Sequence, residues 1–314
     1  MGHTGKRVRG GGRGGRGGRG GRRPGSARGG RWREAAGTVA VVADEAGFAL
    51  LRRRCPTLGF ADHAGYLRAT EALLRSLAGR HGHTSVALFD PAGFADYCER
   101  EGLPPDSPAS RARYTAEVAA RGATVPYAGQ SMDRLLPELR AERHRRDTWE
   151  LGGDLLAAAG DCADCGAPQA RCAFRRAAGL LAGVLERVGP GSHHLVATAL
   201  PDTAPLAAEL TVQIGADGEL RVAEPAALAL CTVLAVCFAT GDPGGLVLRS
   251  TPAEPGAQEV RGWSLRARRA RPLTAGEVFA AYCTDGATGE PVPPEPGVSY
   301  LPAPEPPPTE CLRW

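Results

Sequence analysis

Two short stretches decide the expected fold: TVAVVAD at residues 38–44 and TSVALFDP at residues 84–91. Each is short, largely apolar and contains β-branched residues, which is typical of a buried strand. A helix is expected between them, over about 62–80, because apolar residues recur there at helical spacing. Two strands joined through a helix and more than 40 residues apart predict a parallel β-α-β unit with a right-handed crossover. We therefore expect residues 34–150 to form an α/β domain.

The pattern changes after this segment. A helix is expected up to residue 159, a turn with two cysteines follows, and a further helix is expected over 172–188. Strands come next, including a pair joined by the hairpin signal Gly-Ala-Asp-Gly at 215–218. Residues 151–285 are therefore expected to form an α+β domain.

One apolar run, from Ala226 to Ala239, has to be weighed as a membrane span. It is shorter than the ~20 residues that a spanning helix needs. It also follows Pro225 and ends before Gly241, which is the capping pattern of a buried soluble helix. We expect a soluble protein with no membrane partner and, because no secretory signal is recognised, a cytoplasmic location.

Both ends of the chain differ in composition from the body. Residues 1–33 repeat Arg-Gly-Gly and hold Lys6, ten arginines and no acidic residue, so they carry +11 while the rest carries −7. Such a segment buries too little apolar surface to offset its chain entropy, and we expect a disordered arm. Residues 286–314 contain nine of the 26 prolines. We expect a Pro-rich tail of extended chain, also disordered from about residue 290, with no packed core.

The arm suggests one class of partner. Guanidinium groups on a flexible chain pair with phosphates and stack on unpaired bases, so Arg13, Arg16, Arg19 and Arg22 are candidate nucleic-acid contacts. The same segment contains a GxGxxG match at residues 12–17, but no strand precedes it and no helix is expected to follow. It therefore does not indicate a dinucleotide site.

Nine cysteines, scattered over a long chain, favour unpaired thiols in a reducing compartment. Cys162 and Cys165 have the C-x-x-C-G form of a zinc knuckle, in which two thiolates hold one ion. Cys172 offers a third thiolate, and His193 or His194 would be needed for the fourth ligand. A packed or solvent-facing set of ordinary thiols and a redox pair are the alternatives.

Helix geometry argues against the histidines as ligands. A helix over 172–188 rises about 1.5 Å per residue, so its two ends lie about 25 Å apart. The turn at residues 189–192 is too short to lead His193 or His194 back to the cysteines. We therefore expect no complete zinc site and no cofactor.

Two aspartates follow the predicted strands. In a parallel sheet Asp44 and Asp90 would both lie at the carboxyl edge, where α/β proteins bind ligands. Paired carboxylates there hold Mg²⁺ in phosphoryl-transfer sites. The alternative is that each caps the helix that follows it, which Pro91 after Asp90 favours.

The body resembles a group of hypothetical proteins from streptomycetes and related actinobacteria. The resemblance covers the residue 38–44 stretch, the residue 84–90 strand, the Cys162 turn and the helix expected over 274–283. A single lysine, a single isoleucine and no asparagine agree with a GC-rich genome of that kind. Because these proteins have no assigned activity, the resemblance implies no functional residue.

Three classes of function remain open. A binding or regulatory module is favoured over an enzyme, since no nucleophile, base and oxyanion arrangement is recognised. The alternatives are a nucleic-acid-associated protein that acts through its arm and a metal-dependent enzyme that uses Asp44 and Asp90. Carboxylates that converge in a pocket favour the enzyme, whereas carboxylates turned onto backbone amides favour a structural role.

Overall fold

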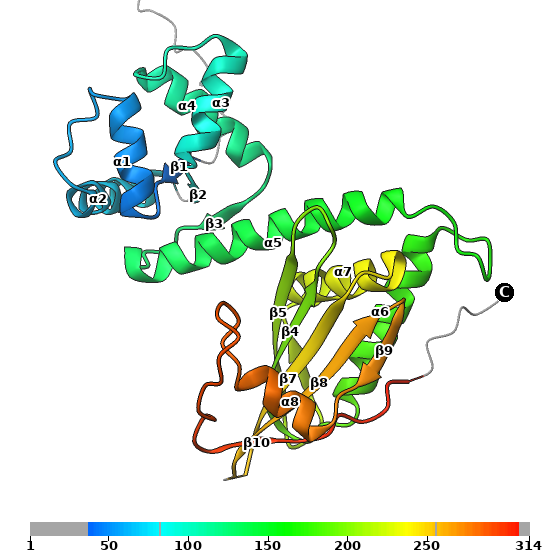
Figure 1. Ribbon diagram of the computed structural model, residues 1–314. Helices are drawn as coiled ribbons and strands as arrows, with labels where there is room; N and C mark the ends of the chain where they lie inside the picture. The colour runs from blue at the N-terminus through cyan, green and yellow to red at the C-terminus, as the bar shows by residue number, and fades with distance from the viewer. Residues whose placement is uncertain (1–36, 82, 255, 308–314) are drawn as a thin grey trace, which may run out of the picture. The chain divides into compact units, whose positions relative to one another are not determined.

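The computed structural model describes residues 37–307, except residues 82 and 255 (Figure 1). The arm and its four candidate arginines therefore lie outside the described residues. In order along the chain, the elements are β1 (Gly37–Val41), α1 (Glu45–Arg54), α2 (His63–His81), β2 (Thr84–Leu88), α3 (Pro91–Glu101), α4 (Pro108–Ala120), β3 (Thr124–Pro126), α5 (Met132–Ala158), α6 (Gln169–Leu185), β4 (Gly191–Ala199), β5 (Leu206–Ile214), β6 (Leu220–Val222), α7 (Glu224–Thr240), β7 (Gly244–Pro252), β8 (Gln258–Arg266), β9 (Arg269–Pro272), α8 (Ala275–Tyr282) and β10 (Val298–Tyr300).

The N-terminal part is built on a three-stranded sheet in the order β1-β2-β3. β1 and β2 are parallel, with Thr38 opposite Ser85 and Val41 opposite Leu88, which confirms the expected parallel unit. β3 completes the sheet in the antiparallel direction. The two strands that carry the aspartates therefore end at the same edge.

A core of buried apolar side chains holds these elements together. Val41, Val86, Phe94 and Leu74 are almost fully buried in it. Burial of each such side chain contributes roughly 1.5–3 kcal/mol to the free energy of folding. The strands that end at this edge are therefore held by a well-packed core.

The second sheet has the order β10-β8-β7-β4-β5-β6. β9 pairs with the second half of β8, and β10 pairs with its first three residues. Its pairs are antiparallel except β10 with β8, and the expected hairpin joins β5 to β6. α6 and α7 pack with this sheet around a second core (Figure 1).

α7 is buried from Ala229 to Ala239, begins with Pro225 in its first turn and ends at Gly241, whose φ is 86°. This confirms the buried helix, and the mixed content confirms the α/β and α+β reading of the fold. Among the described residues, no helix combines the length and apolar character needed to cross a bilayer.

One long helix, α5, runs through the point where the sequence pattern changes. α5 is continuous over 27 residues and contains the expected domain boundary at Glu150. Ion pairs one turn apart, Arg143 with Asp147 at 2.8 Å and Arg146 with Glu150 at 2.9 Å, support the helix across that point. Its first half packs into the N-terminal core and its last turns pack into the second core.

The Pro-rich tail is a correction to the sequence-based expectation. Val298–Tyr300 forms β10 on the edge of β8, and the Leu301 amide donates to the Val260 carbonyl at 2.9 Å. Prolines cannot donate to a strand, but the residues between them can. Residues 298–301 of the tail are therefore paired with the second sheet, whereas residues 286–297 are exposed.

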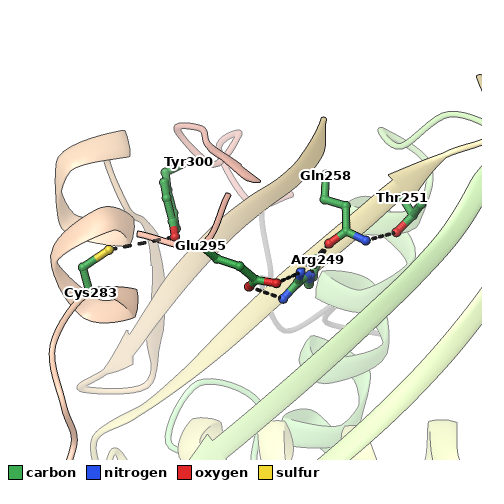
Figure 2. A network of polar contacts seen from close by, with 6 residues as sticks. All are labelled: Arg249, Thr251, Gln258, Cys283, Glu295 and Tyr300. Atoms are coloured by element: carbon green, nitrogen blue, oxygen red, sulfur yellow. Dashed lines mark hydrogen bonds and ion pairs between the residues drawn. The ribbon is translucent and has the colours of Figure 1, made fainter. Parts of the chain in front are cut away.

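Side chains also fasten this tail, as Figure 2 shows. The Arg249 guanidinium donates to both carboxylate oxygens of Glu295, at 2.9 and 2.7 Å. Arg249 is held in turn by Gln258, whose amide donates to the Thr251 hydroxyl at 3.1 Å. The ion pair with Arg249 lowers the pKa of Glu295, so the pair is charged at neutral pH.

Candidate functional site

Three of the candidate residues lie together at the turn between α5 and α6. Cys162 and Cys165 are in the turn and Cys172 is in the first turn of α6. The three sulfur atoms lie within 4.8 Å of one another, and the Sγ atoms of Cys165 and Cys172 are 3.3 Å apart. Cys162 and Cys172 are buried, whereas Cys165 is partly exposed.

Backbone hydrogen bonds shape this turn. The Cys162 amide donates to the Ala167 carbonyl at 2.7 Å, and the Gly166 amide donates to the Cys162 carbonyl at 2.8 Å. Gly166 has a φ of 68°, a conformation that glycine adopts without steric cost. Both cysteines of the C-x-x-C pair are thereby turned to the same side as the start of α6.

The spacing of the sulfurs suits a shared ion. A disulfide would need about 2.05 Å between two sulfurs, so the 3.3 Å between Cys165 and Cys172 is that of separate sulfur atoms. Zinc–sulfur bonds of about 2.3 Å in a tetrahedron place the sulfurs about 3.8 Å apart. The cluster needs only small side-chain adjustments to reach that geometry.

The two histidines considered as ligands are engaged elsewhere. The His193 ring nitrogens contact the Ser250 hydroxyl and the Gly189 carbonyl, each at 2.9 Å, and burial lowers the pKa of His193. His194 lies 3.4 Å from a carboxylate oxygen of Glu209. Both sit on β4, which begins after α6 ends, and neither belongs to the sulfur cluster.

The two aspartates line one crevice at the carboxyl edge of β1 and β2. Each also caps a helix: the Asp44 carboxylate accepts from the Gly47 amide at 2.8 Å and the Asp90 carboxylate accepts from the Ala92 amide at 3.0 Å. Both of the sequence-based interpretations therefore describe part of their geometry. One oxygen of each carboxylate is used as a cap, and both residues border a cavity of about 330 Å³.

α5 supplies the opposite wall of the crevice. Arg140 donates to the Ala43 carbonyl at 2.9 Å, and Arg143 donates from Nε to both oxygens of Asp147, at 2.8 and 2.9 Å. These three α5 residues line the crevice with Asp44 and Asp90. No local sequence signal indicates them, because they follow β2 by more than 50 residues on a helix of ordinary charged composition.

A tyrosine approaches Asp90 from α4. A Cβ atom at Gly93 would lie 2.8 Å from the Tyr114 hydroxyl and 2.9 Å from a carboxylate oxygen of Asp90, so only glycine fits there without a shift. Burial, with a smaller contribution from the Asp90 charge, raises the pKa of Tyr114 to about 12. The hydroxyl is thus a neutral donor at physiological pH.

The fold and these sites define a class: an α/β part with a carboxyl-edge crevice, joined by a shared helix to an α+β part with a thiol cluster. Residues 26–130 match the model of a domain of unknown function, DUF8829. The match includes both crevice aspartates and stops before α5 and the thiol cluster. No curated protein and no solved structure matches the chain.

Proposed function

We propose that this chain is a zinc-binding module in which Cys162, Cys165 and Cys172 hold the ion as thiolates. It acts by binding a partner rather than by catalysis. The single observation that supports the zinc site is the approach of all three sulfur atoms to within 4.8 Å of one another. Soft thiolate ligands favour zinc over the hard cations magnesium and calcium.

The surroundings favour a structural ion. Sites built from thiolates alone are closed, whereas catalytic zinc keeps an open position for water or substrate. Two of the three cysteines are buried, and the cluster joins the turn after α5 to the first turn of α6. Zinc bound there would stabilise the turn that connects α5, which packs into both cores, to α6, which packs on the second sheet.

Metal content tests this proposal. Full-length protein purified with a reductant should hold about one zinc per chain by elemental mass spectrometry. Cys165→Ser should hold much less, and Cys165 is the best position because its partial exposure limits the effect on packing. Cys98→Ser is the control, since Cys98 is buried in the N-terminal core, away from the cluster, and should leave the zinc content unchanged. Folded wild-type protein without zinc, unaffected by added zinc, would overturn the proposal.

A second candidate function rests on the crevice. Asp44, Asp90 and Asp147 line it together, and carboxylate oxygens are the ligands that Mg²⁺ prefers. A Mg²⁺-dependent phosphoryl-transfer enzyme would use this edge of the sheet.

Asparagine substitutions separate this function from the capping role. Asn caps helices about as well as Asp, so Asp44→Asn and Asp90→Asn remove charge and keep the fold. Mg²⁺-dependent hydrolysis of a phosphate ester by the wild type, lost in both variants at an unchanged melting temperature, would support the enzyme. Equal activity of wild type and variants would rule it out.

A further inference from the structure

The segment that follows β10 has a backbone that is restricted before it docks. Each of residues 301–306 either is a proline or directly precedes one. Proline fixes its own φ, and the residue before a proline is restricted to extended or polyproline-type backbone. Residues 301–307 therefore lose little chain entropy when they bind a surface, which is the property that peptide-recognition grooves for proline-rich chains exploit.

Two side chains of the second sheet region contact this segment through its backbone. The Trp263 indole, on β8, donates to the Pro304 carbonyl at 3.0 Å. The Arg187 guanidinium, two residues after the end of α6, donates to the Glu305 carbonyl at 2.8 Å. Glu305 itself is exposed, so the contact reads its carbonyl and not its carboxylate. These donors suit any proline-rich chain of the same shape.

A proline ring also packs closely on α6. A Cβ atom at Gly183 would lie 2.6 Å from the Pro307 ring, so glycine allows the ring to rest on the helix backbone. Gly183 is buried, whereas a Cβ atom at Gly179, one turn earlier, would meet open space. The close approach is therefore confined to the position that the ring occupies.

The segment does not fill the groove in which it lies. A cavity of about 350 Å³ is lined by residues 302–304 of the tail, by Leu248 and Arg261 of the sheet, and by Arg187. Protein cores are close-packed and contain few voids larger than a water molecule. The contact therefore has the character of a peptide held in a surface groove and not of a core.

We propose that this groove is a recognition site for a proline-rich segment of a partner protein, and that residues 302–307 occupy it as an internal competitor. The Arg249–Glu295 ion pair and β10 hold the tail to the sheet just before this segment (Figure 2). A tethered segment competes at high effective concentration, so a partner binds only by displacing it. The groove and the thiol cluster lie at opposite ends of α6, so peptide binding and zinc binding are tested separately.

Peptide binding by the full-length chain tests this site. The tail variant replaces all four prolines of residues 302–307 by serine, which weakens the internal segment and leaves the groove intact. The probe is a labelled peptide of residues 300–307, followed by fluorescence anisotropy. The tail variant should bind it at least about tenfold more tightly than the wild-type chain, because the internal competitor is weakened. A peptide with serine at the four proline positions should bind neither chain.

Single substitutions added to the tail variant locate the site. Arg187→Ala removes the donor to a peptide carbonyl and should weaken binding by about tenfold, since a hydrogen bond from a charged group is lost. Arg221→Ala is the matched control, because Arg221 is also exposed and lies on β6, at the edge of the sheet away from β8. It should leave binding unchanged. Equal effects of the two substitutions would refute the groove as the site.

Two further results would refute the site. One is a tail variant that melts cooperatively and binds the proline peptide no better than the serine peptide. The other is equal affinity of the tail variant and the wild-type chain for the proline peptide. If the tail variant does not fold, the wild-type chain at millimolar peptide decides. Weak binding of the proline peptide alone supports the site, and equal or no binding of the two peptides contradicts it.

Discussion

The α8 capping box shows how a single side chain makes stability depend on pH. The Thr274 hydroxyl accepts from the Glu277 amide at 3.2 Å, and a Glu277 carboxylate oxygen accepts from the Thr274 amide at 2.8 Å. Arg271 donates to the other oxygen at 2.8 Å. The Arg271 hydrogen bond, followed by the bonds from Thr274, lowers the pKa of Glu277 to about 2.

This depressed pKa predicts the direction of an acid effect. The ionised carboxylate contributes stability above the ordinary glutamate pKa of about 4.3, and that contribution is lost as the pH falls toward 2. Glu277→Gln should therefore melt below the wild type at pH 7, with the gap shrinking between pH 4 and pH 2. Melting curves across this range test it, and a gap independent of pH would contradict it.

At the residue scale, the sequence indicated some of the site residues but not the residues that surround them. Asp44 and Asp90 were identifiable because a strand end and a helix cap both leave local patterns. Arg140, Arg143 and Asp147 were not, because only the packing of a distant helix brings them to the crevice. The sulfur cluster was indicated by spacing, but its closeness depends on where the chain enters α6.

At the scale of elements, two glycines of α6, Gly179 and Gly183, allow a test of how the tail packs on this helix. Replacing glycine by alanine inside a helix usually stabilises it by roughly 0.5–1 kcal/mol. Gly179 has open space where a Cβ would go, so Gly179→Ala should show that gain. Gly183→Ala should not, since the new methyl would displace Pro307.

Chemical denaturation of both variants measures this difference in stability. Equal stability gains at the two positions would contradict the packing of Pro307 on α6.

Two elements differ from the local sequence pattern at this scale. The change of pattern near residue 150 does not interrupt α5, which is one helix with one-turn ion pairs next to that point. The density of prolines predicted an unpacked tail, but three residues without proline suffice to pair with the edge of β8. The pairing of the tail depends on β8, a partner distant in the sequence that composition does not reveal.

At the scale of the whole molecule, charge is divided between the arm and the rest. Residues 1–33 carry +11 and residues 34–314 carry −7. We predict that the full-length protein binds single-stranded nucleic acid with an affinity that falls steeply with salt, because cations on the arm release counterions. A chain that starts at residue 34 should not bind, since its net charge repels phosphates.

Fluorescence anisotropy with a labelled oligonucleotide between about 50 and 200 mM salt measures this difference. The affinity of the full-length protein should fall by roughly 10³–10⁵ over this range if about six to ten phosphates are contacted. Equal binding by both chains would assign the activity to the body and refute the role of Arg13, Arg16, Arg19 and Arg22.

The central claim is the zinc site that Cys162, Cys165 and Cys172 form at the turn between α5 and α6. X-ray absorption at the zinc edge, on reduced full-length protein, tests it most directly because it reports the atoms bound to the metal. We predict at least three sulfur neighbours at about 2.3 Å from the zinc ion. Zinc bound only by nitrogen or oxygen atoms at about 2.0–2.2 Å, or folded protein that takes up no zinc, would contradict this claim.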